Sequence, residues 1–145
     1  MKTAVEFQYF AKGPIHHKRE RGSVTPATEA KLKKALDYIE NNYCADISRE
    51  GLAALIDMHP DSLSRFFKQY MDKKIKEHIN GLRIKKALHL LQETDSPIME
   101  IAASVGFESL TTFNRAFLKE VGITPTKYRN RAWVTDRSPY LGKFF

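Results

Sequence analysis

Apolar residues recur along most of the chain at the spacing of an α-helix. Within the segment 26–43, Leu32, Ala35, Leu36 and Ile39 stand three or four positions apart and form one apolar stripe. Four prolines follow a polar residue, and proline is favoured at the first helical position because its missing N–H would have no partner there. The patterns predict helices at about 26–43, 48–56, 60–71, 74–92, 97–105, 109–121 and from 125 onward, with no convincing strand pair.

The two ends of the chain lack this helical spacing. Residues 1–25 begin with a weak alternation of apolar and polar positions and continue into a polar, basic stretch at 16–22 that is typical of a linker. Residues 132–145 contain aromatic side chains without helical spacing. The sequence therefore predicts an N-terminal segment at 1–25, an all-α domain at 26–131 and a C-terminal tail at 132–145.

Part of the all-α domain repeats with a period of about 50 residues. The triplet at 63–65 (LSR) corresponds to the triplet at 113–115 (FNR), and a phenylalanine follows two positions later in both copies. Each copy is expected to form a short helix, a tight turn and a second helix, which is the helix-turn-helix arrangement. The two copies lie at about 48–71 and 97–121.

Each repeat contains residues that suit a tight turn between two closely packed helices. Ala53 and Ala102 are small enough for the second helix to cross the first at short distance. The turn needs a residue that tolerates a positive φ angle, and Gly106 supplies it in the second copy. Asp57 occupies the corresponding position in the first copy, and aspartate is one of the few other residues that visit this region. A chance similarity of two helical segments is the alternative interpretation.

The second helix of each repeat has a polar face opposite its apolar face. Helical spacing centres this polar face on Arg65 in the first copy and on Arg115 in the second, with small polar residues around both. Arginine can bond two atoms of guanine, asparagine can bond adenine, and serine or threonine adapts to either. Lys68 and Lys119 lie near the helix ends, where phosphates are within better reach. The faces therefore suit a DNA major groove, with a merely solvated surface as the alternative.

The basic charge of the chain is concentrated in two blocks. The formal net charge is +7 and the sequence pI is about 9.5, which favours an anionic partner. Residues 62–92 contain eight basic and two acidic side chains, and residues 109–131 contain five basic and one acidic. The predicted helix between the repeats would be roughly 28 Å long, close to the ~34 Å between successive major grooves. The blocks predict contacts with two adjacent grooves of one duplex, unless they are only solvated helix faces.

Few residues suggest chemistry other than binding. Cys44 is the only cysteine, so neither an internal disulfide nor a cysteine-based metal cage can form. The five histidines share no metal-ligand spacing and no catalytic constellation is recognisable, so we expect no enzyme, cofactor or metal site. No apolar run reaches the ~18–20 residues that span a bilayer, and the first residues lack a signal-peptide pattern. The default expectation is a cytoplasmic, nucleoid-associated protein.

The repeats carry motifs that resemble the AraC/XylS family of bacterial transcription regulators. The resemblance covers about 28–131, and its most specific part lies at 101–107 (IAASVGF), 113–117 (FNRAF) and 122–129 (GITPTKYR). The first copy of the repeat matches less closely. The resemblance implies a seven-helix domain in which a long central helix joins two helix-turn-helix subdomains. It also implies asymmetric promoter binding, with base contacts from Asp61, Ser62, Ser64, Arg65, Leu110, Thr111, Asn114 and Arg115.

Residues around these faces are expected to contact phosphates, and some positions depart from the family pattern. The phosphate contacts are Lys68, Gln69, Lys86, Thr112, Lys119, Lys127 and Arg129. Asp57 and Asp72 stand where the family usually has glycine, and His59 stands where serine is usual. Asp61 could accept a hydrogen bond from cytosine or favour the positive start of a helix. Leu110 could touch a thymine methyl group or simply pack.

The resemblance also implies partners. Double-stranded promoter DNA is the first, and RNA polymerase is the second. The family often places a sensor or dimerisation domain upstream, so the chain is expected to be either a small regulator or the DNA-binding end of a larger one. A helical protein-interaction module that contacts RNA polymerase without reading DNA is the alternative from another class.

Overall fold

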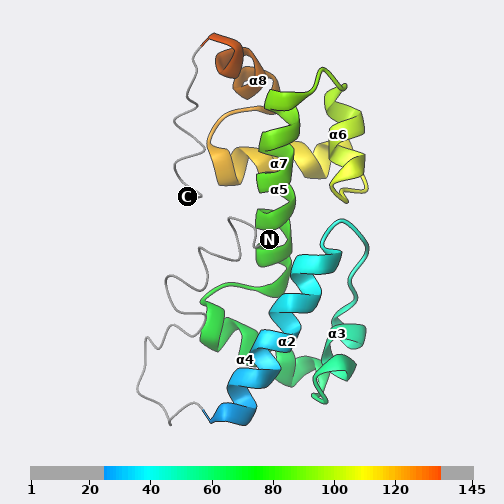
Figure 1. Ribbon diagram of the computed structural model, residues 1–145, viewed down its shortest axis with the longest axis vertical. Helices are drawn as coiled ribbons and strands as arrows, with labels where there is room; N and C mark the ends of the chain where they lie inside the picture. The colour runs from blue at the N-terminus through cyan, green and yellow to red at the C-terminus, as the bar shows by residue number, and fades with distance from the viewer. Residues whose placement is uncertain (1–24, 135–145) are drawn as a thin grey trace. The chain divides into compact units, whose positions relative to one another are not determined.

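The computed structural model describes residues 25–134, and every structural statement below concerns that part of the chain. It contains seven helices and no strand, so the all-α prediction is confirmed (Figure 1). The helices are α2 (Pro26–Asn42), α3 (Arg49–Leu55), α4 (Pro60–Met71), α5 (Ile75–Glu93), α6 (Ile98–Ser104), α7 (Leu110–Val121) and α8 (Pro125–Val134). The predicted linker at 16–22 and the aromatic tail beyond 134 lie outside the described residues, and the predicted domain limits stay predictions.

Three of the four prolines begin helices as expected, and one does not. Pro26, Pro60 and Pro125 are the first residues of α2, α4 and α8. Pro97 instead precedes α6, because its ψ of 145° is extended rather than helical. The helix therefore begins at Ile98, and no side chain caps its first turn.

The described residues fall into two compact units. The first comprises the residues up to 42 together with 46–79, and so contains α2, α3, α4 and the start of α5. The second comprises 43–45 and the residues from 80 onward, and so contains the rest of α5 with α6, α7 and α8. Each unit holds one of the two predicted helix-turn-helix repeats.

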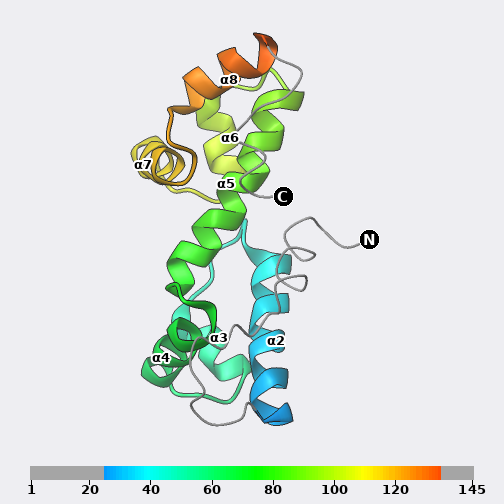
Figure 2. The same cartoon turned by 90° about the vertical axis from the view of Figure 1, so that its left-hand side faces the viewer.

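In the first unit, α3 packs against both α2 and α4 (Figure 2). His78 of α5 is buried, and its ring meets the ring of Phe67 edge-on at a centroid distance of 5.5 Å. Burial, and secondarily the charge of Lys73, lower the pKa of His78 to about 3, so its imidazole is neutral at pH 7. The other buried apolar residues from α2 to α4 are Leu32, Ala35, Ile39, Leu52, Ala53, Ile56 and Leu63.

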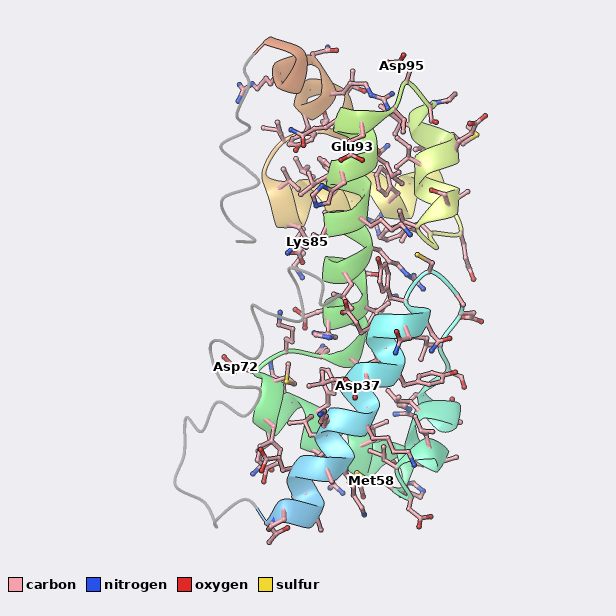
Figure 3. The ribbon with its side chains drawn as sticks, viewed as in Figure 1. Asp37, Met58, Asp72, Lys85, Glu93 and Asp95 are labelled. Atoms are coloured by element: carbon pink, nitrogen blue, oxygen red, sulfur yellow. The ribbon has the colours of Figure 1, made fainter. Side chains whose placement is uncertain are left out.

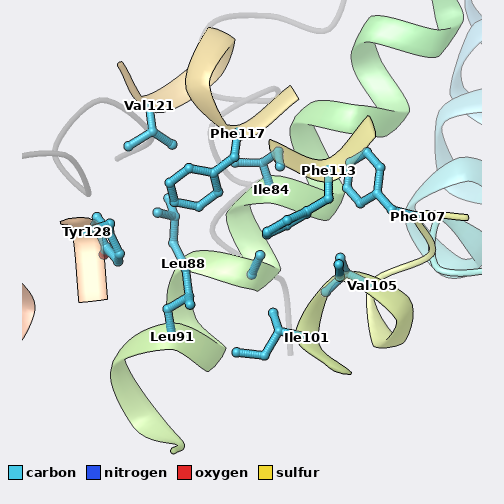
Figure 4. Packing of buried hydrophobic residues seen from close by; sticks show 12 residues of the cluster. Ile84, Leu88, Leu91, Ile101, Val105, Phe107, Phe113, Phe117, Val121 and Tyr128 are labelled. Atoms are coloured by element: carbon cyan, nitrogen blue, oxygen red, sulfur yellow. The ribbon is translucent and has the colours of Figure 1, made fainter. Parts of the chain in front are cut away.

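In the second unit, α7 packs against α6 and α8 around a chain of aromatic rings (Figure 4). Phe107 contacts Phe113 at 5.4 Å between centroids, Phe113 contacts Phe117 at 5.6 Å, and Phe117 contacts Tyr128 at 5.9 Å. Such pairs contribute about 0.5–1.5 kcal/mol each beyond the area they bury. The central helix α5 closes this core with Ile84, Ala87, Leu88 and Leu91.

Arg83 of α5 ties the segment 43–45 into the second unit. Its guanidinium donates hydrogen bonds to the carbonyl oxygens of Tyr43 and Ala45, the latter at 2.9 Å. The same guanidinium lies 5.6 Å from the centre of the Phe107 ring. One side chain thus satisfies two backbone acceptors and packs against the residue that follows the turn of the second repeat.

Candidate nucleic-acid interface

The tight turn of each helix-turn-helix unit contains one residue with a positive φ. Asp57 has a φ of 58° in the first turn and Gly106 has a φ of 110° in the second, as the repeat predicted. The same rule holds where the second helices end, with Asp72 after α4 at 58° (Figure 3) and Gly122 after α7 at 92°. The two aspartates therefore adopt a conformation that glycine more often supplies.

Matching hydrogen bonds close the two turns. The amide of Met58 donates to the carbonyl of Ala53 at 2.9 Å, and the amide of Phe107 donates to the carbonyl of Ala102 at 3.0 Å. Both alanines are buried. The repeat found in the sequence is therefore also a repeat of backbone geometry.

The helices α4 and α7, which we call the recognition helices, begin with different side-chain caps. Ser109 accepts a hydrogen bond from the amide of Thr112 at 3.1 Å before α7. His59 stands before α4, and its Nδ1 accepts from the amide of Asp61 at 3.2 Å. The imidazole thus replaces the serine hydroxyl as the acceptor that caps the helix.

The structure exposes five of the eight predicted base-reading residues. Arg65 and Arg115 are exposed, and no carboxylate among the described residues pairs with either. The exposed base-reading positions also include Asp61, Thr111 and Asn114, whereas Ser62, Ser64 and Leu110 are half-buried. Of the predicted phosphate contacts, Lys68, Gln69, Lys86, Thr112, Lys119 and Lys127 are exposed and Arg129 is half-buried.

Asp61 has a contact that the sequence did not predict. Its carboxylate lies 3.3 Å from the guanidinium of Arg49 in α3. It also stands in the first turn of α4, where the helix dipole favours a negative charge. The position in the first turn supports the helix-start interpretation of Asp61, and a contact with cytosine stays a prediction.

Three other predicted contacts have structural roles as well. Leu110 packs against the core of the second unit, which supports the packing interpretation for this residue. The hydroxyl of Ser64 donates to the carbonyl of Pro60 at 3.3 Å, and the hydroxyls of Thr112 and Ser109 lie 2.9 Å apart. A hydroxyl that is bonded in this way keeps acceptor capacity for a base or phosphate group.

Arg129 binds backbone carbonyl oxygens at the end of α5. Its guanidinium donates to the carbonyl oxygens of Leu91 and Thr94 at 3.3 and 3.2 Å. These carbonyls lie at the C-terminal end of α5, where helix acceptors lack partners within the helix. Arg129 thus holds α8 against α5, a role that no sequence pattern indicated, and its phosphate contact stays a prediction.

The exposed groups of the recognition helices are hydrogen-bond donors and acceptors rather than a reactive set. No group of three or more His, Cys, Asp or Glu residues that could hold a metal ion occurs within 25–134. Over the same residues, no helix has the length and apolar character needed to cross a membrane. A guanidinium flanked by small polar side chains is suited to bidentate recognition of a base edge.

Comparison with known proteins places the chain in a family. A family profile described as a helix-turn-helix domain matches residues 52–131, more than half of the chain. A transcriptional regulator from Chromobacterium violaceum, whose description names an AraC-type DNA-binding domain, is 28% identical with a TM-score of 0.65. This similarity covers 74% of the present chain and 96% of the other. The chain belongs to the AraC/XylS family.

Other regulators share this AraC/XylS fold or sequence. The regulatory protein PocR of Salmonella typhimurium is 30% identical over 142 residues, which cover 97% of the chain and 47% of PocR. The C-terminal domain of AraT, a response regulator from Geobacillus stearothermophilus, is 31% identical with a TM-score of 0.64, over 76% of the chain and 88% of that domain. The chain spans less than half the length of the curated relatives that it matches.

Proposed function

We propose that this AraC/XylS chain binds double-stranded promoter DNA sequence-specifically, with α4 and α7 entering adjacent major grooves of one duplex. One observation carries the proposal. Two helix-turn-helix units with matching turns each present an exposed arginine, Arg65 or Arg115, at the equivalent position of the second helix. A duplicated surface of this kind suits a ligand that repeats its own surface, as successive major grooves do.

The side chains suggest how the bases are read. Arg65 and Arg115 can each donate two hydrogen bonds to O6 and N7 of a guanine, and Asn114 can pair with an adenine. Lys68 and Lys119 lie in the last turns of the recognition helices, where they reach backbone phosphates. In this proposal the arginines select the sequence, and the lysines supply affinity that is nearly independent of sequence.

Further partners follow from binding at a promoter. RNA polymerase is the proposed second partner, because a regulator bound beside a promoter acts on transcription through the polymerase. A sensor or dimerisation domain is also proposed, since PocR is more than twice as long as the part of it that matches the chain. The proposed place of action is the nucleoid in the cytoplasm.

A salt titration on a selected duplex tests the proposal. A DNA site is chosen by rounds of selection from a random library, and its affinity is compared with that of a scrambled duplex between 50 and 200 mM salt. The logarithm of the binding constant should fall linearly with the logarithm of salt concentration, by about 0.9 for each phosphate contacted. Equal affinity for all duplexes, or binding to RNA polymerase alone with little salt dependence, would favour the protein-interaction module instead.

Two substitutions separate base reading from phosphate binding. Arg115→Ala should cost about 1–3 kcal/mol on the selected site and relax the preference at one base pair. Lys68→Ala should weaken binding to all duplexes by the same factor and serves as the control. An equal loss on every duplex for Arg115→Ala would remove this arginine from base reading.

A further inference from the structure

A groove in the first unit lies directly beside the recognition helix α4. Ser62, Arg65 and Gln69 line it from α4, and Thr28 and Lys31 line it from the first turns of α2. Its volume is about 400 Å³. These three polar residues of α4 are predicted DNA contacts, so the groove continues the proposed interface toward α2.

The groove carries positive charge. Lys31 and Arg65 both line it, and no acidic residue does. Neither cation has a carboxylate partner among the described residues. Uncompensated cations facing one cavity favour an anionic occupant.

The groove also has an apolar wall. The rings of Phe66 and Tyr70 both line it and contact each other edge-on, with 5.0 Å between their centroids. Met58, in the loop before α4, adds a further apolar side chain (Figure 3). The occupant therefore needs an anionic group and an uncharged, weakly polar part next to it.

We propose that this groove takes the sugar–phosphate backbone of the DNA strand that borders the major groove entered by α4, with Lys31 as a phosphate contact outside the helix-turn-helix. The inference rests on the proposed function. A major groove is roughly 12 Å wide between its two backbones, so two side chains lining one cavity can reach a base edge and a bordering phosphate together. Arg65 meets the base, Lys31 meets the phosphate, and the aromatic wall packs against deoxyribose.

Lysines on the same helix provide a matched control. Lys31 lines the groove, whereas Lys33, two residues further along α2, is exposed and does not line it. Lys31→Gln should reduce the slope of log affinity against log salt by about 0.9, because one phosphate contact is lost. The loss should be the same on the selected and the scrambled duplex. Lys33→Gln should leave the slope unchanged.

Ethylation interference then places the contact on the DNA. Ethylation of one phosphate beside the base pair read by Arg65 should weaken binding of the unsubstituted protein and have no effect on binding of Lys31→Gln. If Lys31→Gln and Lys33→Gln show the same slope and the same interference pattern, the inference is wrong and the groove receives a protein or a small anion instead. That result differs from failure of the proposed function, in which the unsubstituted protein shows no sequence preference at all.

Discussion

The turn between α3 and α4 and the turn between α6 and α7 have the same backbone pattern but different surroundings. Asp57 is exposed at a φ of 58°, near the centre of the left-handed region that aspartate tolerates. Gly106 has a φ of 110°, which lies outside that region. A Cβ atom on Gly106 would also stand 2.8 Å from the carbonyl oxygen of Cys44 and 2.8 Å from Nε of Arg83.

This difference separates two reasons for a glycine in a helix-turn-helix turn. In the first unit the position requires only a positive φ, so a short polar residue can replace glycine at modest cost. In the second unit the position also requires empty space, because the segment 43–45 and Arg83 approach the turn closely. A glycine is therefore replaceable in one repeat and necessary in the other.

The largest effect is expected for Gly106→Ala. The strained φ and the contact with the backbone of Cys44 should together lower the free energy of unfolding by about 2–5 kcal/mol. Urea denaturation followed by circular dichroism measures this loss. Asp57→Ala is the matched substitution and should cost only about 1–2 kcal/mol, because alanine tolerates this φ less well than aspartate but adds no atom to the turn. Equal losses for the two variants would contradict the distinction between the turns.

The second-largest effect is expected at low pH, where the first unit should lose more stability than the second. The folded-state pKa of His78 in the first unit is lowered to about 3 from an ordinary value of 6.5, whereas the second unit has no buried histidine among its described residues. The unfolded chain therefore binds this proton more readily, so the contribution of the neutral imidazole is complete above pH 6.5 and declines as the pH falls from 6.5 toward 3. The free energy of unfolding of the first unit should therefore be about 2 kcal/mol lower at pH 5 than at pH 7.

Residue-resolved urea denaturation by NMR at pH 7 and pH 5 measures the acid effect. Signals from α4 should report a lower midpoint at pH 5, and signals from α7 should change less. His78→Leu should remove the pH dependence of the first unit, because no proton is taken up on unfolding. A parallel shift of both units in the unsubstituted protein would contradict the assignment to His78.

A smaller effect is expected at the caps of the recognition helices. Ser109→Ala removes the acceptor of the Thr112 amide and should cost about 1 kcal/mol of stability, as measured by thermal denaturation. His59→Ala removes the corresponding acceptor in the first unit and should cost a similar amount if the imidazole is an equivalent cap. A cost near zero for His59→Ala would show that Pro60 alone is sufficient to start α4.

Much of the fold followed from local patterns. The apolar spacing in α2 and the prolines at the starts of α4 and α8 were readable because each concerns residues within one or two helical turns. The Asp57–Gly106 correspondence was readable because the sequence repeats after about 50 residues. The exposed positions of Arg65 and Arg115 followed from the same helical periodicity. The start of α6 was displaced by one residue because the backbone at Pro97 is extended, a choice that proline permits.

Other features of the candidate site had no local signal. Arg129 binds carbonyl oxygens 38 and 35 residues away, and Arg49 meets Asp61 across 12 residues. The sequence predicted Arg129 as a phosphate contact from its charge, and it predicted no contact for Arg49. Lys31 could not be associated with Arg65, because they lie on different helices and only packing brings them to one groove.

By itself, the sequence determined the number and approximate extent of the described helices, which residue types can form the two turns, and which side of each recognition helix is polar. These features depend on backbone conformations and spacings within a few residues. The tertiary structure alone decided that Gly106 needs empty space as well as a positive φ, that Arg83 and Arg129 bind distant carbonyl oxygens, and that Lys31 faces α4. Such contacts join residues far apart in the chain, and the packing of the cores decides which of them meet.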